Sequence, residues 1–269
     1  MPNFFSKNQS HIFILQGALG TELARRGYKM TLPLWTGDAS LKVPHIIDEI
    51  YSDYIAAGAD IITTNTFRTN RRTFLKVGNR GEYARATRAS VQCALSAKRR
   101  AKRQIYVGGV IAPLEDCYTP SLVPETRELE KEHSEQIRLM ASLGVDCVWI
   151  ETMNTIREAR IAARFAEATS LPFVVSFVVN VNGDILSGET FGEASAALAP
   201  YKPDAILVNC SPGAHISRAI QKLRQCFKGR IGAYAAGLGS PTKDGGWKFP
   251  SCEDEAVLQY LSEVKQWLP

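Results

Sequence analysis

The sequence lacks any pair of cysteines with metal-binding or redox spacing. Its six cysteines are scattered, with no Cys-x-x-Cys pair among them: Cys93, Cys117, Cys147, Cys210, Cys226 and Cys252. Six cysteines in 269 residues are too sparse for a disulfide scaffold. The simplest expectation is a reducing, cytoplasmic setting.

Long apolar runs are also missing. Residues 1–10 contain no apolar stretch of signal-peptide length, and no later run is long enough to span a bilayer. The net charge of +5 is small, and the densest basic run, residues 98–103, closes a predicted helix. Cations are favourable there because the helix dipole is negative at that end. We therefore expect neither a membrane anchor nor a nucleic-acid partner.

Two chemical signatures are absent as well. No Gly-x-Gly-x-x-Gly follows the first predicted strand, which argues against a dinucleotide-binding, doubly wound sheet. No lysine stands at the end of a predicted strand, which disfavours a Schiff-base aldolase.

The sequence does contain seven strand–helix units. Short apolar runs alternate with helical patterns, and this strict alternation predicts parallel strands covered by helices. We predict one α/β domain over residues 1–269, a TIM-type (β/α)8 barrel whose eighth strand is missing or replaced. The predicted strands are 12–15, 60–64, 105–111, 145–150, 172–179, 205–208 and 230–235, and the predicted helices are 45–57, 82–103, 125–143, 156–168, 193–199, 215–227 and 253–267.

Active sites of such barrels lie at the carboxyl ends of the strands. Gln16, Asn65, Glu151 and Cys210 each follow a predicted strand, and Ser176 lies within one. At this position a carboxylate such as Glu151 is suited to bind a substrate ammonium group or to act as a base. A salt bridge to a neighbouring loop is the alternative.

Cys210 is a thiol at the same end of the predicted barrel. It is a candidate metal ligand, a candidate nucleophile or an inert packed residue. The four histidines fall at a strand start, at helix starts or in mid-helix, so a histidine-activated nucleophile is disfavoured.

At these residues the sequence resembles the homocysteine S-methyltransferase family, which includes the homocysteine-binding modules of methionine synthase and betaine-dependent methyltransferase. The most specific matching segment is AGADIITTNTF at residues 57–67. The other matches are GALGTEL at 17–23, Leu34-Trp35, Gly144-Val145-Asp146, Glu151-Thr152 and Val208-Asn209-Cys210. They occur in order over residues 12–212, beyond which the resemblance thins.

The resemblance implies an eight-stranded α/β barrel that methylates the thiol of homocysteine to give methionine. In the family, three cysteine thiolates hold zinc, and homocysteine supplies the fourth ligand through its sulfur. By this resemblance, Cys210 is the strand-six zinc ligand and Glu151 holds the substrate amino group. Gln16, Gly17, Asn65 and Ser176 complete the expected substrate-binding set.

The sequence departs from the family at the expected site. The family's Gly-Gly-Cys-Cys segment has no counterpart in residues 1–269, so two of the three zinc ligands are lacking. The first strand ends in Gln16-Gly17 where the family usually has Asp-Gly. The family's asparagine after strand seven is also missing from the run Tyr-Ala-Ala-Gly at 234–237.

Three functional interpretations remain open. The first is a methyltransferase that binds homocysteine, or a related amino-acid thiol, and a methyl donor. The second is a non-catalytic or truncated family member that binds a small molecule or a partner. The third is an enzyme with altered, metal-free chemistry. The exposed barrel edges favour a homo-oligomer in each case.

Overall fold

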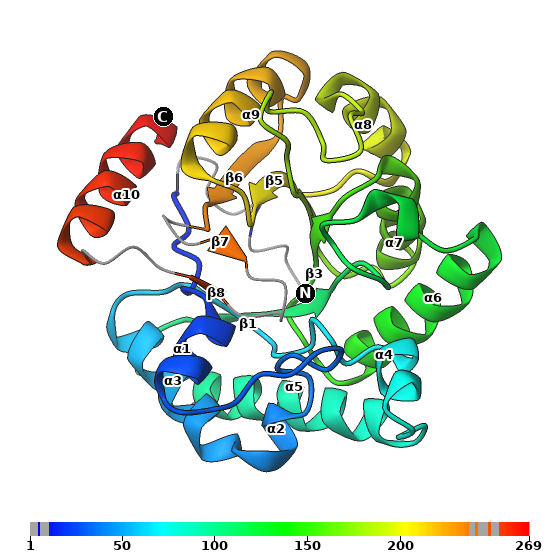
Figure 1. Ribbon diagram of the computed structural model, residues 1–269, viewed down its shortest axis with the longest axis vertical. Helices are drawn as coiled ribbons and strands as arrows, with labels where there is room; N and C mark the ends of the chain where they lie inside the picture. The colour runs from blue at the N-terminus through cyan, green and yellow to red at the C-terminus, as the bar shows by residue number, and fades with distance from the viewer. Residues whose placement is uncertain (1–4, 6–10, 237–239, 242–246, 249–252, 269) are drawn as a thin grey trace.

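A parallel β-sheet, curled on itself and ringed by helices, forms the centre of the molecule (Figure 1). The computed structural model describes residues 5, 11–236, 240–241, 247–248 and 253–268. Its six-stranded sheet has the order β1-β2-β3-β4-β5-β6, so each strand pairs with its neighbours along the chain. The strands are β1 Ile61–Thr63, β2 Tyr106–Ile111, β3 Cys147–Met153, β4 Phe173–Phe177, β5 Ala205–Asn209 and β6 Arg230–Tyr234.

The helices follow the strands in the predicted alternation, with ends that differ from the predicted ones by a few residues. Helix α7 shows why: Thr155 caps its first turn, and its buried face is a row of alanines that fits closely against the sheet. The helices are α1 Leu19–Arg25, α2 Ala39–Lys42, α3 Pro44–Ala56, α4 Arg71–Lys76, α5 Glu82–Arg100, α6 Thr126–Ser142, α7 Ile156–Glu167, α8 Phe191–Leu198, α9 Gly213–Cys226 and α10 Glu253–Trp267.

The first predicted strand, 12–15, is reduced to one isolated parallel bridge between Leu15 and Ile61. The backbone N–H of Gln16 donates to Ile61 O at 2.9 Å, so the segment follows β1 for a short distance only. Ile12 and Ile14 are about half exposed, which explains why apolar burial does not extend the strand. A short antiparallel pair, β7 Ser240–Pro241 with β8 Trp247–Lys248, was not predicted.

Strands β1 to β5 have two buried faces, as their nearly continuous apolar sequences predicted, whereas β6 is partly buried along its whole length. One face packs against the helices and forms the larger core. The other face encloses a second cluster inside the curl of the sheet: Phe5, Ile61, Val110, Cys147, Trp149, Val174, Ala205 and Leu207. Alternation along β3 therefore directs Cys147 and Trp149 inward.

The N-terminal segment is bonded to the last strand of the sheet. Arg230, at the start of β6, donates to Phe5 O from Nε and to His11 O from a terminal nitrogen, each at 3.0 Å. Its guanidinium also lies over the Phe13 ring, 5.5 Å from the centroid. These contacts connect residues more than two hundred positions apart.

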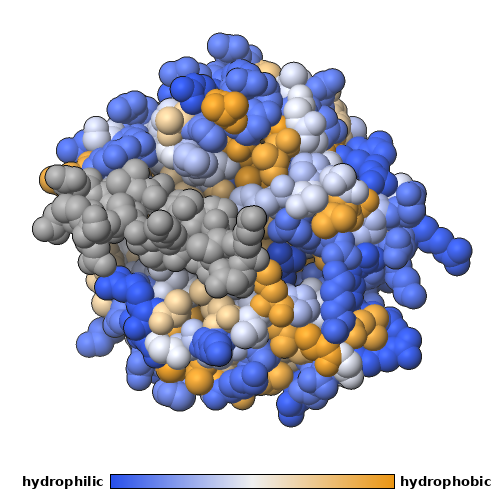
Figure 2. All heavy atoms as spheres, in the orientation of Figure 1, coloured by the Kyte–Doolittle hydropathy of each residue, from blue (hydrophilic) through white to orange (hydrophobic). Residues whose placement is uncertain are grey.

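Three of the basic residues at 98–103 form ion pairs within the fold. Lys98 binds Asp146 at 2.6 Å, Arg100 binds Asp48 at 2.5 Å and Arg103 binds Asp60 at 2.9 Å. In the part of the chain that is described, no helix combines the length and apolar character needed to cross a membrane. The face shown in Figure 2 is mostly hydrophilic around its periphery.

Candidate functional site

An irregularity in β3 lies at the carboxyl end of the sheet. The pairing of β3 with β4 shifts register between Ile150 and Met153, a bulge that contains Glu151 and Thr152. Thr152 has φ +61°, the left-handed region, which is rare for a β-branched residue. Bulges of this kind redirect side chains and are common beside active sites.

Cys210 follows β5 in a similarly strained conformation, with φ +52°. Its backbone N–H donates to Tyr234 O at 3.2 Å, and its carbonyl accepts from the Tyr118 hydroxyl at 3.3 Å. Non-glycine residues in this region cost free energy that surrounding contacts must offset. The strain at Thr152 and Cys210 marks this end of the sheet as a candidate site.

Asn209 connects the ends of four strands while being fully buried. Its Oδ1 accepts from Ser176 Oγ at 2.6 Å and from the backbone N–H of Thr152 at 3.2 Å. Its Nδ2 lies 2.8 Å from Thr152 Oγ1, 3.1 Å from Tyr234 Oη and 3.2 Å from Cys210 Sγ. One amide thus fixes β3, β4, β5 and β6 relative to one another.

The surroundings of Cys210 shift the pKa of its thiol in opposite directions. Burial first, and then the nearby Glu151 carboxylate, raise the pKa of its thiol, which is about 11. Hydrogen bonds with Tyr234, Thr152 and Asn209 oppose that rise because they favour the thiolate.

Glu151 is the most perturbed carboxyl group at this site. Burial raises its pKa to about 8, and the residue is only 9% exposed. No residue in the described part of the chain donates a hydrogen bond to its carboxyl group. A carboxylate desolvated without a partner is suited to receive a cationic group from a ligand.

The remaining predicted site residues are held by the protein itself. Both ends of the Gln16 side-chain amide bind Thr63. Nε2 donates to Oγ1 and Oε1 accepts from the backbone N–H, each at 3.0 Å. Gly17 lies where Tyr54 packs, and a Cβ atom there would lie 2.7 Å from that ring unless the ring moved. Ser176 is bonded to Asn209, as described above.

Asn65 is directed toward the segment before α2. Its Oδ1 accepts from Thr36 Oγ1 and its Nδ2 donates to Thr36 O, both at 2.8 Å. Ser176, Glu151 and Cys210 thus lie at the ends of β3, β4 and β5, whereas the side-chain hydrogen bonds of Asn65 within the described residues go to Thr36 and Ser40.

Four residues of this network were not singled out from the sequence as site residues: Tyr118, Thr152, Asn209 and Tyr234. Thr152 and Asn209 adjoin a named candidate, and Tyr234 lies near the end of the predicted strand 230–235, so their position was a usable signal. Tyr118 lies in a loop, and only the folded chain brings it to Cys210.

The described residues do not form a zinc site. In the ranges given above, no three histidine, cysteine, aspartate or glutamate side chains gather closely enough to hold a metal ion. Cys147 lies in the inner apolar cluster, where burial raises its pKa far above the usual range. Cys252 falls outside the described residues. Cys210 would therefore contribute a single thiolate to a site that normally needs three protein ligands.

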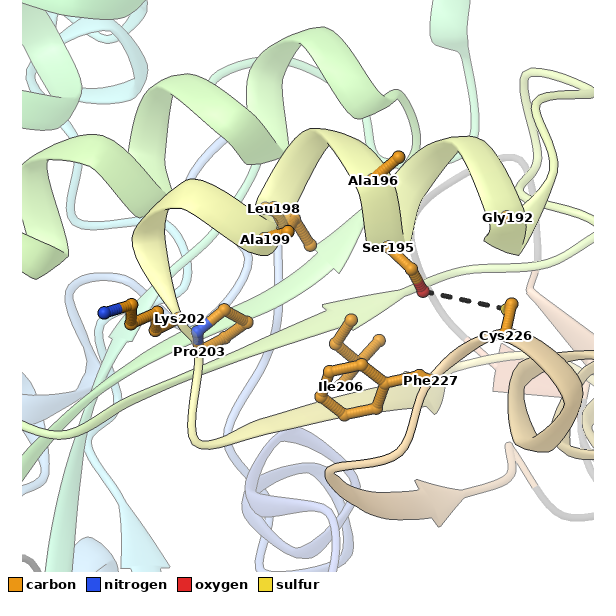
Figure 3. Close-up of a pocket in the computed structure, with 10 residues that line it drawn as sticks. All are labelled: Gly192, Ser195, Ala196, Leu198, Ala199, Lys202, Pro203, Ile206, Cys226 and Phe227. Atoms are coloured by element: carbon orange, nitrogen blue, oxygen red, sulfur yellow. Dashed lines mark hydrogen bonds between the residues drawn. The ribbon is translucent and has the colours of Figure 1, made fainter.

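A groove in the helix layer lies away from this network. It holds about 460 Å³ and runs between α8 and the end of α9, with Ser195, Cys226 and Phe227 in its lining (Figure 3). Ile206 contributes from the helix-facing side of β5, whereas its neighbour Leu207 faces the inner cluster. The groove belongs to the helix layer and not to the network at the strand ends.

Comparison with solved structures supports the parallel α/β architecture. The metallated form of the homocysteine methyltransferase MmuM from Escherichia coli superimposes with a TM-score of 0.81 at 20% sequence identity. The alignment covers 97% of this chain and 89% of that one. The chain therefore shares the fold of that enzyme. In this chain, the strained polar network described above lies at the carboxyl end of the sheet.

Comparison of sequences then identifies the family to which the chain belongs. The family described as homocysteine S-methyltransferase matches residues 13–268, and the chain belongs to that family. A selenocysteine methyltransferase of Astragalus bisulcatus is 28% identical, over 79% of this chain and 72% of the relative. The homocysteine S-methyltransferase YbgG of Bacillus subtilis is 25% identical, over 80% and 74% respectively.

Proposed function

We propose that this protein transfers a methyl group from a small-molecule donor to the thiol of homocysteine, giving methionine. Membership of the family supports the reaction class. The observation that carries the site is Glu151, a buried carboxyl group with a raised pKa and no hydrogen-bond donor among the described residues. Its natural partner is the ammonium group of an amino-acid substrate.

Glu151 is the single carboxylate that we assign to the substrate ammonium. Gln16 stands where the family usually has an aspartate, and its amide is already bonded to Thr63 at both ends. Binding of the acceptor's ammonium group therefore depends on one carboxylate, that of Glu151. Since the ionised carboxylate is what binds an ammonium ion, acceptor affinity should rise as Glu151 loses its proton.

The acceptor sulfur would lie near Cys210, because the Glu151 carboxylate is close enough to raise the pKa of that thiol. In the family, zinc binds and activates the acceptor thiol. The described residues supply one ligand for such an ion, so no step is derived through it. The same proposal includes a complete (β/α)8 barrel that forms one domain. It also includes a cytoplasmic setting, a role in methionine synthesis and formation of a homo-oligomer.

Methyl transfer tests the proposal directly. The purified chain is incubated with homocysteine and, separately, S-methylmethionine, betaine or a methylfolate, and methionine is quantified. We expect product with one donor class and a loss of roughly a hundredfold in the Glu151→Ala variant, since a charge-assisted contact to the substrate is removed. No product with any donor would favour the binding-protein interpretation.

A further inference from the structure

Helices α4, α5 and α6 lie next to one another on one side of the molecule (Figure 1). A small cavity of about 10 Å³ lies between them, and its lining includes Asn70 at the start of α4, Thr87 of α5, and Glu132 and Gln136 of α6. One buried water molecule requires roughly 10–15 Å³. The cavity therefore has room for a single small ligand.

Three polar atoms of these lining residues are buried and have no hydrogen-bond partner in the described part of the chain: Asn70 Nδ2, Glu132 Oε2 and Gln136 Oε1. Asn70 is 3% exposed and Gln136 is 5% exposed. Buried polar groups in native proteins nearly always have a partner, because an unpaired one loses its hydration without compensation. Three such atoms on the residues around one cavity indicate a ligand that bonds to all of them.

The backbone fixes which end of each side-chain amide is left for the ligand. Asn70 Oδ1 accepts the Thr73 N–H at 2.8 Å, so the remaining end of Asn70 is the donor Nδ2. Gln136 Nε2 donates to Thr66 O at 3.4 Å, so its remaining end is the acceptor Oε1. With the second carboxylate oxygen of Glu132, the cavity presents one donor and two acceptors.

We propose that this cavity binds one ordered water molecule, which accepts a hydrogen bond from Asn70 Nδ2 and donates to Glu132 Oε2 and Gln136 Oε1. Buried waters typically make about three hydrogen bonds, and water can give two and receive one here. A metal cation or an ammonium ion would face the N–H of Asn70, which it cannot accept, and an anion would face the Glu132 carboxylate.

The bound water would join the segment after β1 to α6. Gln136 already holds this segment at Thr66 through Nε2, and the water adds a second connection, from Gln136 Oε1 to Asn70. Thr66 directly follows the candidate site residue Asn65, and its hydroxyl also donates to Val110 O at 2.8 Å. The water is therefore a structural ligand at the carboxyl end of β1, and this role does not depend on the proposed function.

The chain offers a matched pair of buried asparagines for the test. Asn65 is 4% exposed, and its Nδ2 donates to Thr36 O and Ser40 Oγ, whereas Asn70 Nδ2 is assigned to the water. Rotating-frame NMR on the whole chain, labelled with ¹⁵N at asparagine, detects dipolar contact between water and each side-chain NH₂. The sign of a cross-peak separates a held water from proton exchange.

We expect a dipolar water cross-peak at the Asn70 side-chain NH₂ and none at that of Asn65. The Asn70→Asp variant identifies the Asn70 signal by its loss, and through-bond experiments on the wild type identify it if the variant does not fold. No water cross-peak at Asn70, or equal cross-peaks at both asparagines, would overturn the proposal.

A high-resolution crystal structure of the whole chain is a second, independent measurement. We expect one electron-density peak roughly 2.7–3.2 Å from all three atoms. An empty cavity, or Asn70 and Gln136 turned so that these atoms pair with other protein groups, would contradict the assignment.

Discussion

At the scale of single residues, Glu151 and Cys210 show what strand-end position alone can predict. Both were predicted because each follows an apolar run, and the structure places them near one another at the end of the sheet. The bulge at Thr152 and the Asn209 network were not predictable. A positive φ and an amide that binds four strands depend on neighbours distant in sequence.

The raised pKa of Glu151 leads to a prediction about stability. Its pKa is about 8 in the folded chain and near its ordinary 4.5 in the unfolded chain, so the folded state holds the proton more tightly. Stability should therefore fall as pH rises from about 4.5 to 8 and then level off. Glu151→Gln removes this loss and should be more stable above pH 8, by at most about 5 kcal/mol.

Urea denaturation of the wild type and Glu151→Gln at pH 5, 7 and 9 measures this difference in unfolding free energy. The gap between the two proteins should widen with pH. A gap that stays constant over this range would show that Glu151 does not titrate with a raised pKa.

At the scale of elements, the sequence predicted the long helices and central strands well because their apolar periodicity is strong. It failed at segment 12–15, where four apolar residues suggested a strand that has only one bridged residue. It also missed the short helices α1, α2 and α4, whose few turns carry little periodic signal.

Helices α6 and α7 are joined by a fully buried pair, His133 and Glu158. Glu158 Oε1 lies 2.9 Å from His133 Nε2 and accepts the Leu114 backbone N–H at the same distance. Glu158→Ala leaves the His133 ring and the Leu114 N–H buried without this acceptor. We therefore expect a loss of about 3–5 kcal/mol in unfolding free energy. Chemical denaturation at pH 7 measures it.

Glu130→Ala is the matched control on the same pair of helices. Its carboxylate binds Arg164 at 2.9 Å, but both side chains are more than a third exposed. Its loss should cost less than about 1 kcal/mol. Equal losses in the two variants would contradict the role assigned to the buried pair.

At the scale of the whole molecule, a parallel sheet curls until its last strand is bonded to the start of the chain. Arg230 makes that connection, and its partners are backbone carbonyls, which no sequence pattern could reveal. Strand alternation predicted the curl of the sheet, whereas the contact that joins its ends became visible only in the fold.

Removing this contact should loosen the N-terminal segment. Arg230→Ala deletes two charge-assisted hydrogen bonds and the cation–π contact with Phe13, and we expect unfolding free energy to fall by about 2–3 kcal/mol. Arg25→Ala, which breaks an exposed pair with Glu22, should change it by less than about 0.5 kcal/mol. Unfolding free energies are measured by thermal and urea denaturation. Equal losses in Arg230→Ala and Arg25→Ala would argue against a role for Arg230 in joining β6 to the N-terminal segment.

The central claim is that Glu151 receives the ammonium group of a homocysteine-like acceptor. Isothermal titration calorimetry with homocysteine at pH 7, repeated in buffers of different ionisation enthalpy, tests it most directly. Because Glu151 is mostly protonated at that pH, binding an ammonium ion should release close to one proton, and Glu151→Gln should bind much more weakly and release none. Binding without proton release, or equal affinity in Glu151→Gln, would contradict the account.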